Sequence, residues 1–121
     1  MSSKIMVVDD SVSIRKVVAM VLGKSGHEVI ESKDGVEALQ KVAQENLDLI
    51  ICDVNMPEMD GITFLQKMRQ QVGKRDIPVI MLTTESQGRL RELGEDAGAR
   101  AWILKPFQPP QLIEVVQNIL G

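Results

Sequence analysis

Three stretches of sequence decide the fold, namely IMVVDD at residues 5–10, LIICD at residues 49–53 and AWILK at residues 101–105. Each stretch is a short run of apolar residues that ends in a charged side chain. Short apolar runs separated by segments with helical spacing are typical of parallel strands that are buried on both faces. The three stretches therefore indicate an α/β protein with a parallel sheet.

The charged residues at the ends of these runs are Asp9, Asp10, Asp53 and Lys105. In an open α/β sheet the ligand crevice lies beyond the carboxyl ends of the strands, so we expect these side chains to converge. Carboxylates held close together repel one another by roughly 4 kcal/mol per pair at an effective dielectric constant near 20. A bound cation would offset this repulsion, and carboxylate oxygens are suitable ligands for Mg²⁺.

The overall composition is that of an ordinary globular protein. The chain has 121 residues with a net charge of −3, and we expect one domain that covers residues 1–121. The acidic balance gives no support to nucleic-acid binding. Cys52 is the only cysteine, which excludes an internal disulfide, and no apolar run approaches the length of a membrane span. We therefore expect a soluble, cytoplasmic protein that binds neither nucleic acid nor membranes.

The rest of the chain alternates between the two kinds of secondary structure. Apolar runs predict strands at residues 4–8, 27–32, 48–53, 78–82 and 101–104. Helical spacing and caps predict helices at 12–24, after Asp34, at 62–71, at 86–97 and from Pro109 or Pro110 onward. The first helix has apolar residues at helical spacing: Ile14, Val17, Val18, Val21 and Leu22. Five strands alternating with five helices predict a doubly wound α/β sandwich.

Four motifs carry a resemblance to a known family: VVDDS at 7–11, DVNMPEMDG at 53–61, LTT at 82–84 and KPF at 105–107. Together and in this order they resemble the receiver domain of bacterial two-component response regulators, over essentially the whole chain. The resemblance implies a flavodoxin-like sheet with strand order 2-1-3-4-5. Because the chain ends after the fifth helix, it is most similar to the stand-alone chemotaxis regulators of that family.

The resemblance also implies roles for individual residues. Asp53 would be the phosphoacceptor, and Asp9, Asp10, Asp53 and the backbone carbonyl of Asn55 would hold Mg²⁺. Lys105 would pair with Asp53 and then with the phosphoryl oxygens, and it would precede a cis peptide bond to Pro106. The Thr83 hydroxyl would donate a hydrogen bond to a phosphoryl oxygen.

Trp102 departs from the family pattern, which usually has tyrosine or phenylalanine three residues before the lysine. We expect Trp102 to act with Thr83 as a switch whose exposure reports activation, and a fixed anchor over apolar surface is the alternative. Gly88 and Gly94 lower the helical propensity of the fourth helix, so we expect it to have low local stability.

The function that the resemblance implies is a phosphorylation-controlled signalling switch, not a conventional enzyme. A sensor histidine kinase would supply the phosphoryl group, and its specificity would involve the exposed face of the first helix, with Arg15 and Val18 as candidates. The chain would catalyse its own phosphorylation and dephosphorylation. The face made by the fourth helix, fifth strand and fifth helix would bind a target protein, such as the flagellar motor switch in chemotaxis. We expect a monomer that is able to pair on activation through the fourth and fifth helices.

Three alternatives belong to other classes. An enzyme or electron carrier on the same fold would need a phosphate-binding loop or a G-x-G-x-x-G motif after the first strand, where Asp9-Asp10-Ser11-Val12 stands instead. A docking domain that works without phosphorylation would not need the full set of acidic and basic positions. A receiver cut from a longer DNA-binding response regulator would share every motif described above.

Overall fold

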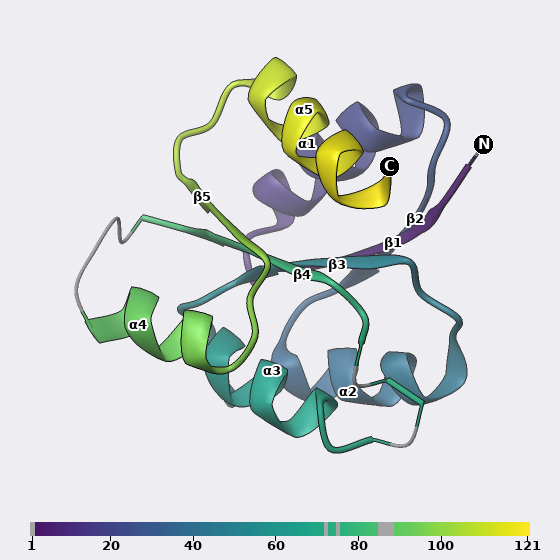
Figure 1. The fold of residues 1–121 in the computed structure, drawn as a ribbon. Helices are drawn as coiled ribbons and strands as arrows, with labels where there is room; N and C mark the ends of the chain where they lie inside the picture. The colour runs from purple at the N-terminus through teal and green to yellow at the C-terminus, as the bar shows by residue number, and fades with distance from the viewer. Residues whose placement is uncertain (1, 72, 75, 85–88) are drawn as a thin grey trace.

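The computed structural model describes residues 2–71, 73–74, 76–84 and 89–121. Strands and helices alternate along these residues (Figure 1). The strands are β1 (Lys4–Val8), β2 (Glu28–Ser32), β3 (Leu49–Asp53), β4 (Val79–Thr83) and β5 (Ala101–Leu104). The helices are α1 (Val12–Lys24), α2 (Gly35–Gln44), α3 (Gly61–Met68), α4 (Arg89–Asp96) and α5 (Pro109–Leu120).

The strands form one parallel sheet in the order β2-β1-β3-β4-β5, which confirms the predicted architecture. Its register aligns the strand ends: Val8 lies beside Cys52, and Thr83 lies beside Leu104. The residues that follow the strands therefore meet at one edge of the sheet, as expected for an open α/β fold.

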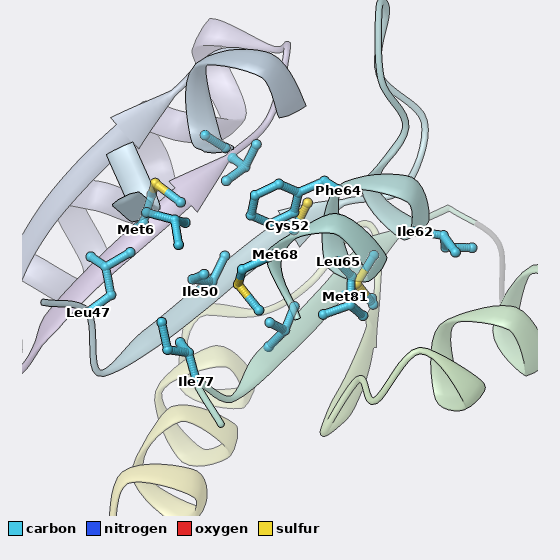
Figure 2. Packing of buried hydrophobic residues seen from close by; sticks show 14 of the residues in the cluster. Met6, Leu47, Ile50, Cys52, Ile62, Phe64, Leu65, Met68, Ile77 and Met81 are labelled. Carbon is cyan, nitrogen blue, oxygen red and sulfur yellow. The ribbon is translucent and has the colours of Figure 1, made fainter. Parts of the chain in front are cut away.

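Side chains alternate between the two faces of the sheet, so the core has two layers. On β3, for example, Ile50 and Cys52 belong to the layer under α2 and α3, whereas Leu49 and Ile51 belong to the layer under α1 and α5. Figure 1 shows α1 and α5 on one face of the sheet and α2, α3 and α4 on the other. Figure 2 shows the first of these layers, in which Phe64 and Met68 of α3 pack onto the sheet. Because β1, β3 and β4 are covered on both faces, their sequences are continuous apolar runs.

Side-chain caps set the beginnings of three helices. Ser11 accepts a hydrogen bond from the Ile14 amide, which decides between the two candidate caps that the sequence offered for this helix, Ser11 and Asp10. Asp34 accepts a hydrogen bond from the Glu37 amide, as predicted. Asp60 caps α3 in the same way, by accepting from the Thr63 amide at 2.8 Å. This third cap starts α3 at Gly61 and brings the beginning of the helix close to the end of β3.

The apolar face of α1 differs from the prediction. Val18, which was predicted both for the apolar stripe and for a partner-binding exposed face, is fully buried, so its place in the stripe is confirmed and its place on the exposed face is wrong. Val17, also assigned to the stripe, is 40% exposed. The two positions are adjacent and differ by about 100° around the helix axis. Because the apolar spacing includes both residues, it does not decide which of them is buried. The exposed apolar residues of α1 are Val12, Val17 and Met20.

Several element boundaries also differ from the prediction by a few residues. The second strand begins at Glu28 because the His27 amide donates to the Leu22 carbonyl at the end of α1. The third helix ends at Met68, and isolated turns follow it. The predicted start of the fourth helix at residues 86–88, which includes Gly88, lies outside the described residues, and α4 is described from Arg89. The apolar spacing of the last helix predicts a buried face made of Leu112, Val115, Val116, Ile119 and Leu120. In the structure Leu112 and Val116 are buried, whereas the other three are half-buried.

Candidate functional site

Three carboxylates meet beyond the carboxyl ends of β1 and β3. One carboxylate oxygen from each of Asp9, Asp10 and Asp53 lies within 4.8 Å of the other two. Asp9 and Asp53 are buried, with 1% and 7% of their surface exposed, whereas Asp10 is exposed. The cluster therefore has a buried floor and one side that is open to solvent.

The backbone around Asp9 holds this side chain in a defined position. Its amide donates to the Ser32 carbonyl at 3.1 Å, and its Oδ1 accepts from the Ser11 amide at 2.9 Å. The Arg15 guanidinium donates to the Asp9 carbonyl at 2.6 Å and also contacts Glu31. Arg15 thus supports the site from α1, a role that sequence reasoning missed because it had placed Arg15 on a partner-binding face.

Gly61 allows α3 to begin directly against the end of β3. A Cβ atom at this position would lie 2.1 Å from the Asp53 carbonyl oxygen, a distance that no side chain could tolerate. The Gly61 amide donates to the Val54 carbonyl at 2.8 Å, which closes the loop after β3. The sequence indicates only that Gly61 ends the loop after the third strand, whereas the structure makes the glycine a requirement for the position of Asp53.

Lys105 reaches across the sheet edge to two of the carboxylates. Its Nζ lies 2.9 Å from Asp9 Oδ2 and 3.4 Å from Asp53 Oδ1. The prediction paired Lys105 with Asp53 alone, and the shorter contact in the structure is with Asp9. The Lys105 amide donates to the Thr83 carbonyl at 2.7 Å, and the peptide bond from Lys105 to Pro106 is cis, as the resemblance implied.

The electrostatics of the site follow from burial and like charge. Burial raises the pKa of Asp53 to about 6; the negative charges of Asp9 and Asp10 add to the rise, and Lys105 opposes it. Burial lowers the pKa of Lys105, but its hydrogen bond with Asp9 and the nearby charge of Asp53 outweigh this effect, and the net change is a rise. Burial also raises the pKa of Cys52 beneath the site, and the thiol stays protonated. Asp53 therefore carries its negative charge at neutral pH in an environment that disfavours that charge.

The other predicted site residues lie on β4, in the loop after β3, and on β5. Thr83 is the last residue of β4 and is buried. The side chain of Asn55 is exposed in the loop after β3, where it lines a shallow pocket with Asp60 and Leu93. Trp102 is half-buried on β5, which β4 separates from β3, and it packs against the core layer that lies under α2 and α3.

The ligand set suits a hard divalent cation. All of the candidate ligands are oxygens, which Mg²⁺ and Ca²⁺ prefer over nitrogen or sulfur. The open side at Asp10 leaves room for waters, and Mg²⁺ in proteins usually keeps several of them. Lys105 supplies a cationic side chain that forms ion pairs with two of these carboxylates, Asp9 and Asp53. The residues present therefore fit a magnesium ion.

Comparisons with known proteins agree on one family. The model of the response regulator receiver domain matches residues 5–117. The alkaline phosphatase synthesis transcriptional regulatory protein PhoP of Bacillus subtilis is 41% identical over 120 residues, which are 99% of this chain and 49% of that protein. The chain thus spans about half the length of this relative.

Two solved structures are similar over the whole chain. The chemotaxis protein CheY4 of Vibrio cholerae has a TM-score of 0.95 and 41% identity, covering 99% of this chain and 100% of that one. The receiver domain of the sensor histidine kinase PA1611 of Pseudomonas aeruginosa, with a magnesium ion coordinated in its active-site cleft, has a TM-score of 0.92 and 27% identity, covering 100% and 99%. In the described part of this chain, no helix combines the length and apolar character needed to cross a bilayer.

Proposed function

Because this chain belongs to the response regulator receiver domain family, we propose that it is a signalling switch controlled by phosphorylation of Asp53. Members of this family are regulatory phosphoacceptors and not conventional enzymes. The observation that carries the assignment to Asp53 is its position: it is the buried carboxylate that ends β3, beside Asp9, Asp10 and the ammonium of Lys105. A carboxylate in such a place can act as a nucleophile toward phosphorus.

Asp9, Asp10, Asp53 and the backbone carbonyl of Asn55 would hold Mg²⁺. When bound, the ion supplies positive charge that offsets the charge developing on the transferring phosphoryl group. Support comes from the three carboxylate oxygens within 4.8 Å of one another and from the magnesium ion in the similar Pseudomonas receiver domain.

The proposed reaction has two steps. In the first, a carboxylate oxygen of Asp53 forms a bond to phosphorus while the bond from phosphorus to the donor nitrogen of a phosphohistidine breaks, and the histidine nitrogen keeps the electron pair. In the second, the oxygen of water forms a bond to phosphorus while the bond from phosphorus to the Asp53 oxygen breaks; the carboxylate keeps the electron pair, and inorganic phosphate and the proton of the water are released. Lys105 exchanges its contact with Asp53 for the phosphoryl oxygens, since its flexible stem lets the ammonium follow the charge. The Thr83 hydroxyl donates a hydrogen bond to a phosphoryl oxygen.

The proposed donor is a sensor histidine kinase, acting in the cytoplasm, that docks on α1. The predicted contact at Val18 is withdrawn, because a fully buried side chain cannot meet a partner. The exposed apolar residues Val12, Val17 and Met20 take its place, because apolar side chains surrounded by polar residues are typical of protein interfaces.

The proposed output is binding of a target protein through the face made by α4, β5 and α5. The protein would be a monomer that is able to pair through the same face on activation. Chemotaxis is the first pathway to test and transcriptional control is the second. A chemotaxis regulator and a transcriptional regulator are equally similar to this chain, each at 41% identity. Phosphorylation would shift a two-state equilibrium that involves Thr83 and Trp102.

Phosphoramidate, whose bond from phosphorus to nitrogen resembles that of phosphohistidine, provides a direct test. The protein is incubated with phosphoramidate and Mg²⁺, and covalently bound phosphoryl groups are counted by intact mass. We expect one phosphoryl group per chain, no incorporation in EDTA, and no incorporation in Asp53→Asn. Asp10→Asn is a matched control: it should weaken Mg²⁺ binding, so that more Mg²⁺ is needed for incorporation, and it should leave the acceptor carboxylate intact. Absence of any adduct in the wild-type protein would move the function to docking without phosphorylation.

A further inference from the structure

Helix α4 has few apolar side chains with which to hold itself on the sheet. Its sequence is RLRELGED, and among the side chains described for it, Leu93 is the one that packs against the core layer. Helices in proteins owe most of their stability to packing of an apolar face, so a helix of this composition needs other contacts to stay in place. Two further contacts are visible, one in the middle of α4 and one just beyond its C-terminal end.

The contact in the middle of α4 is between Gly94 and the indole of Trp102. A Cβ atom at Gly94 would lie 2.4 Å from Trp102 Cζ3 and 3.2 Å from Cη2. The six-membered ring of the indole therefore occupies the space that any other residue would fill, and it covers Gly94, which is buried although its neighbours Glu92 and Glu95 are exposed. We refer to this arrangement as the Gly94–Trp102 contact.

Charged residues of α4 extend the contact over the ring. The Arg91 guanidinium carbon lies 6.0 Å from the centre of the Trp102 ring, at the outer limit of a cation–π interaction. Arg91 Nε also lies 3.2 Å from Glu95 Oε1, one helical turn further along. The indole is thus held between the backbone of α4 at Gly94 and the side chain of Arg91.

The second contact holds the segment after α4. The Arg69 guanidinium, at the end of α3, donates to the Gly98 carbonyl at 2.9 Å and also to the Ile77 carbonyl before β4. Gly98 has φ +97°, and a Cβ there would lie 3.3 Å from Arg69 Nε. These hydrogen bonds tie the segment after α4 to the end of α3, and residue 102 takes no part in them.

We propose that α4 is anchored at its C-terminal end by Arg69 and held along its length by a releasable Gly94–Trp102 contact, so that movement of the indole frees the helix. Gly94 is then a positioning residue: it lets a tryptophan be used at residue 102, where any larger residue at 94 would push the ring away. The signalling consequence rests on the proposed function, in which α4 and β5 form part of the target-binding face. The coupling between ring and helix does not require phosphorylation.

The test compares Gly94→Ala with Gly23→Ala, a glycine-to-alanine control in the last turn of α1, where a Cβ would meet nothing within 4 Å. Trp102 emission, its quenching by acrylamide and amide hydrogen exchange are measured without Mg²⁺ or phosphodonor. For Gly94→Ala we expect red-shifted emission, stronger quenching and exchange of the α4 amides that is faster by about tenfold, with α1 unchanged. For Gly23→Ala we expect wild-type emission and wild-type exchange in α4.

A second background separates the contact from a simple loss of packing. In Trp102→Leu, where no indole is present, adding Gly94→Ala should leave exchange in α4 unchanged or slow it, because alanine is the better helix former. Faster exchange of similar size in both backgrounds, or unchanged emission in Gly94→Ala, would overturn the proposal. The same measurements can be made in Asp53→Asn, so a failed phosphorylation assay would not affect this result. A failed test of the Gly94–Trp102 contact would likewise not affect the assignment of Asp53.

Discussion

Replacing Asp53 with asparagine should stabilise the metal-free protein at neutral pH. Burial and the neighbouring charge of Asp9 raise the pKa of Asp53 to about 6 in the folded chain, above its value of 3.8 in a model compound. The folded state therefore binds a proton more tightly than the unfolded state, and ionisation of Asp53 opposes folding. Stability is lost as the pH rises from about 4 to about 6, and the penalty is fully present above about pH 6. Asparagine has the shape of the protonated acid and carries no charge, so it removes the penalty.

The magnitude follows from the change in pKa. A rise from 3.8 to about 6 would correspond to about 3 kcal/mol if the carboxylate were sealed from water. The site is open to solvent at Asp10, and screening there reduces the expected gain to about 1 to 2 kcal/mol. The gain should be largest above about pH 7 and should shrink as the pH falls toward about 4; it vanishes only below the unfolded-state pKa of 3.8, where Asp53 is protonated in both states.

The assay is equilibrium unfolding in urea, with EDTA present, at several pH values between about 4 and 8. Asp10→Asn serves as the control, because it removes the same charge from an exposed position and should change stability by less than about 0.5 kcal/mol. A gain in Asp53→Asn that does not vary with pH, or an equal gain in Asp10→Asn, would refute the reasoning. A loss of stability in Asp53→Asn at neutral pH would show that the contact with Lys105 outweighs burial and repulsion.

Three further predictions concern the core and the site. Gly61→Ala should destabilise the protein by about 3 kcal/mol or more in urea unfolding, because the new Cβ would meet the Asp53 carbonyl oxygen at 2.1 Å; a near-wild-type midpoint would contradict this. Val18→Ala should cost about 2 kcal/mol and Val17→Ala less than about 0.5 kcal/mol in the same assay, since only Val18 is buried; equal costs would contradict the assigned faces of α1. Lys105→Met should slow phosphorylation by acetyl phosphate at least about tenfold, followed by intact mass, because the charge beside Asp53 is lost; an unchanged rate would remove Lys105 from the proposed chemistry.

Much of the fold could be predicted from sequence because its signals are local. Apolar runs ending in charge marked each of the strands that carry the site, and the caps at Ser11 and Asp34 marked the starts of their helices. Convergence of Asp9 and Asp53 followed from the general rule for parallel sheets. The strand order came only from the resemblance to a family, since alternation of strands and helices permits other orders.

What could not be predicted depends on contacts between distant segments. Whether Val17 or Val18 of α1 faces the core is decided by how the helix sits on the sheet, which the spacing of apolar residues leaves open. The shorter contact of Lys105 with Asp9 depends on side-chain geometry beyond the carboxyl ends of β1 and β5, two strands that are not neighbours in the sheet. The close approach of Trp102 to Gly94 gives no signal in either local sequence, because each residue has an ordinary interpretation by itself.

The measurement that tests the central claim most directly is the location of the phosphoryl group after treatment with acetyl phosphate and Mg²⁺. Borohydride reduces an acyl phosphate to an alcohol, and peptide mass mapping then identifies the modified residue. We expect modification of Asp53 alone, at one site per chain, and none in Asp53→Asn. Modification at Asp9 or Asp10, or an unmodified chain although Mg²⁺ is bound, would contradict the assignment of Asp53 as the phosphoacceptor.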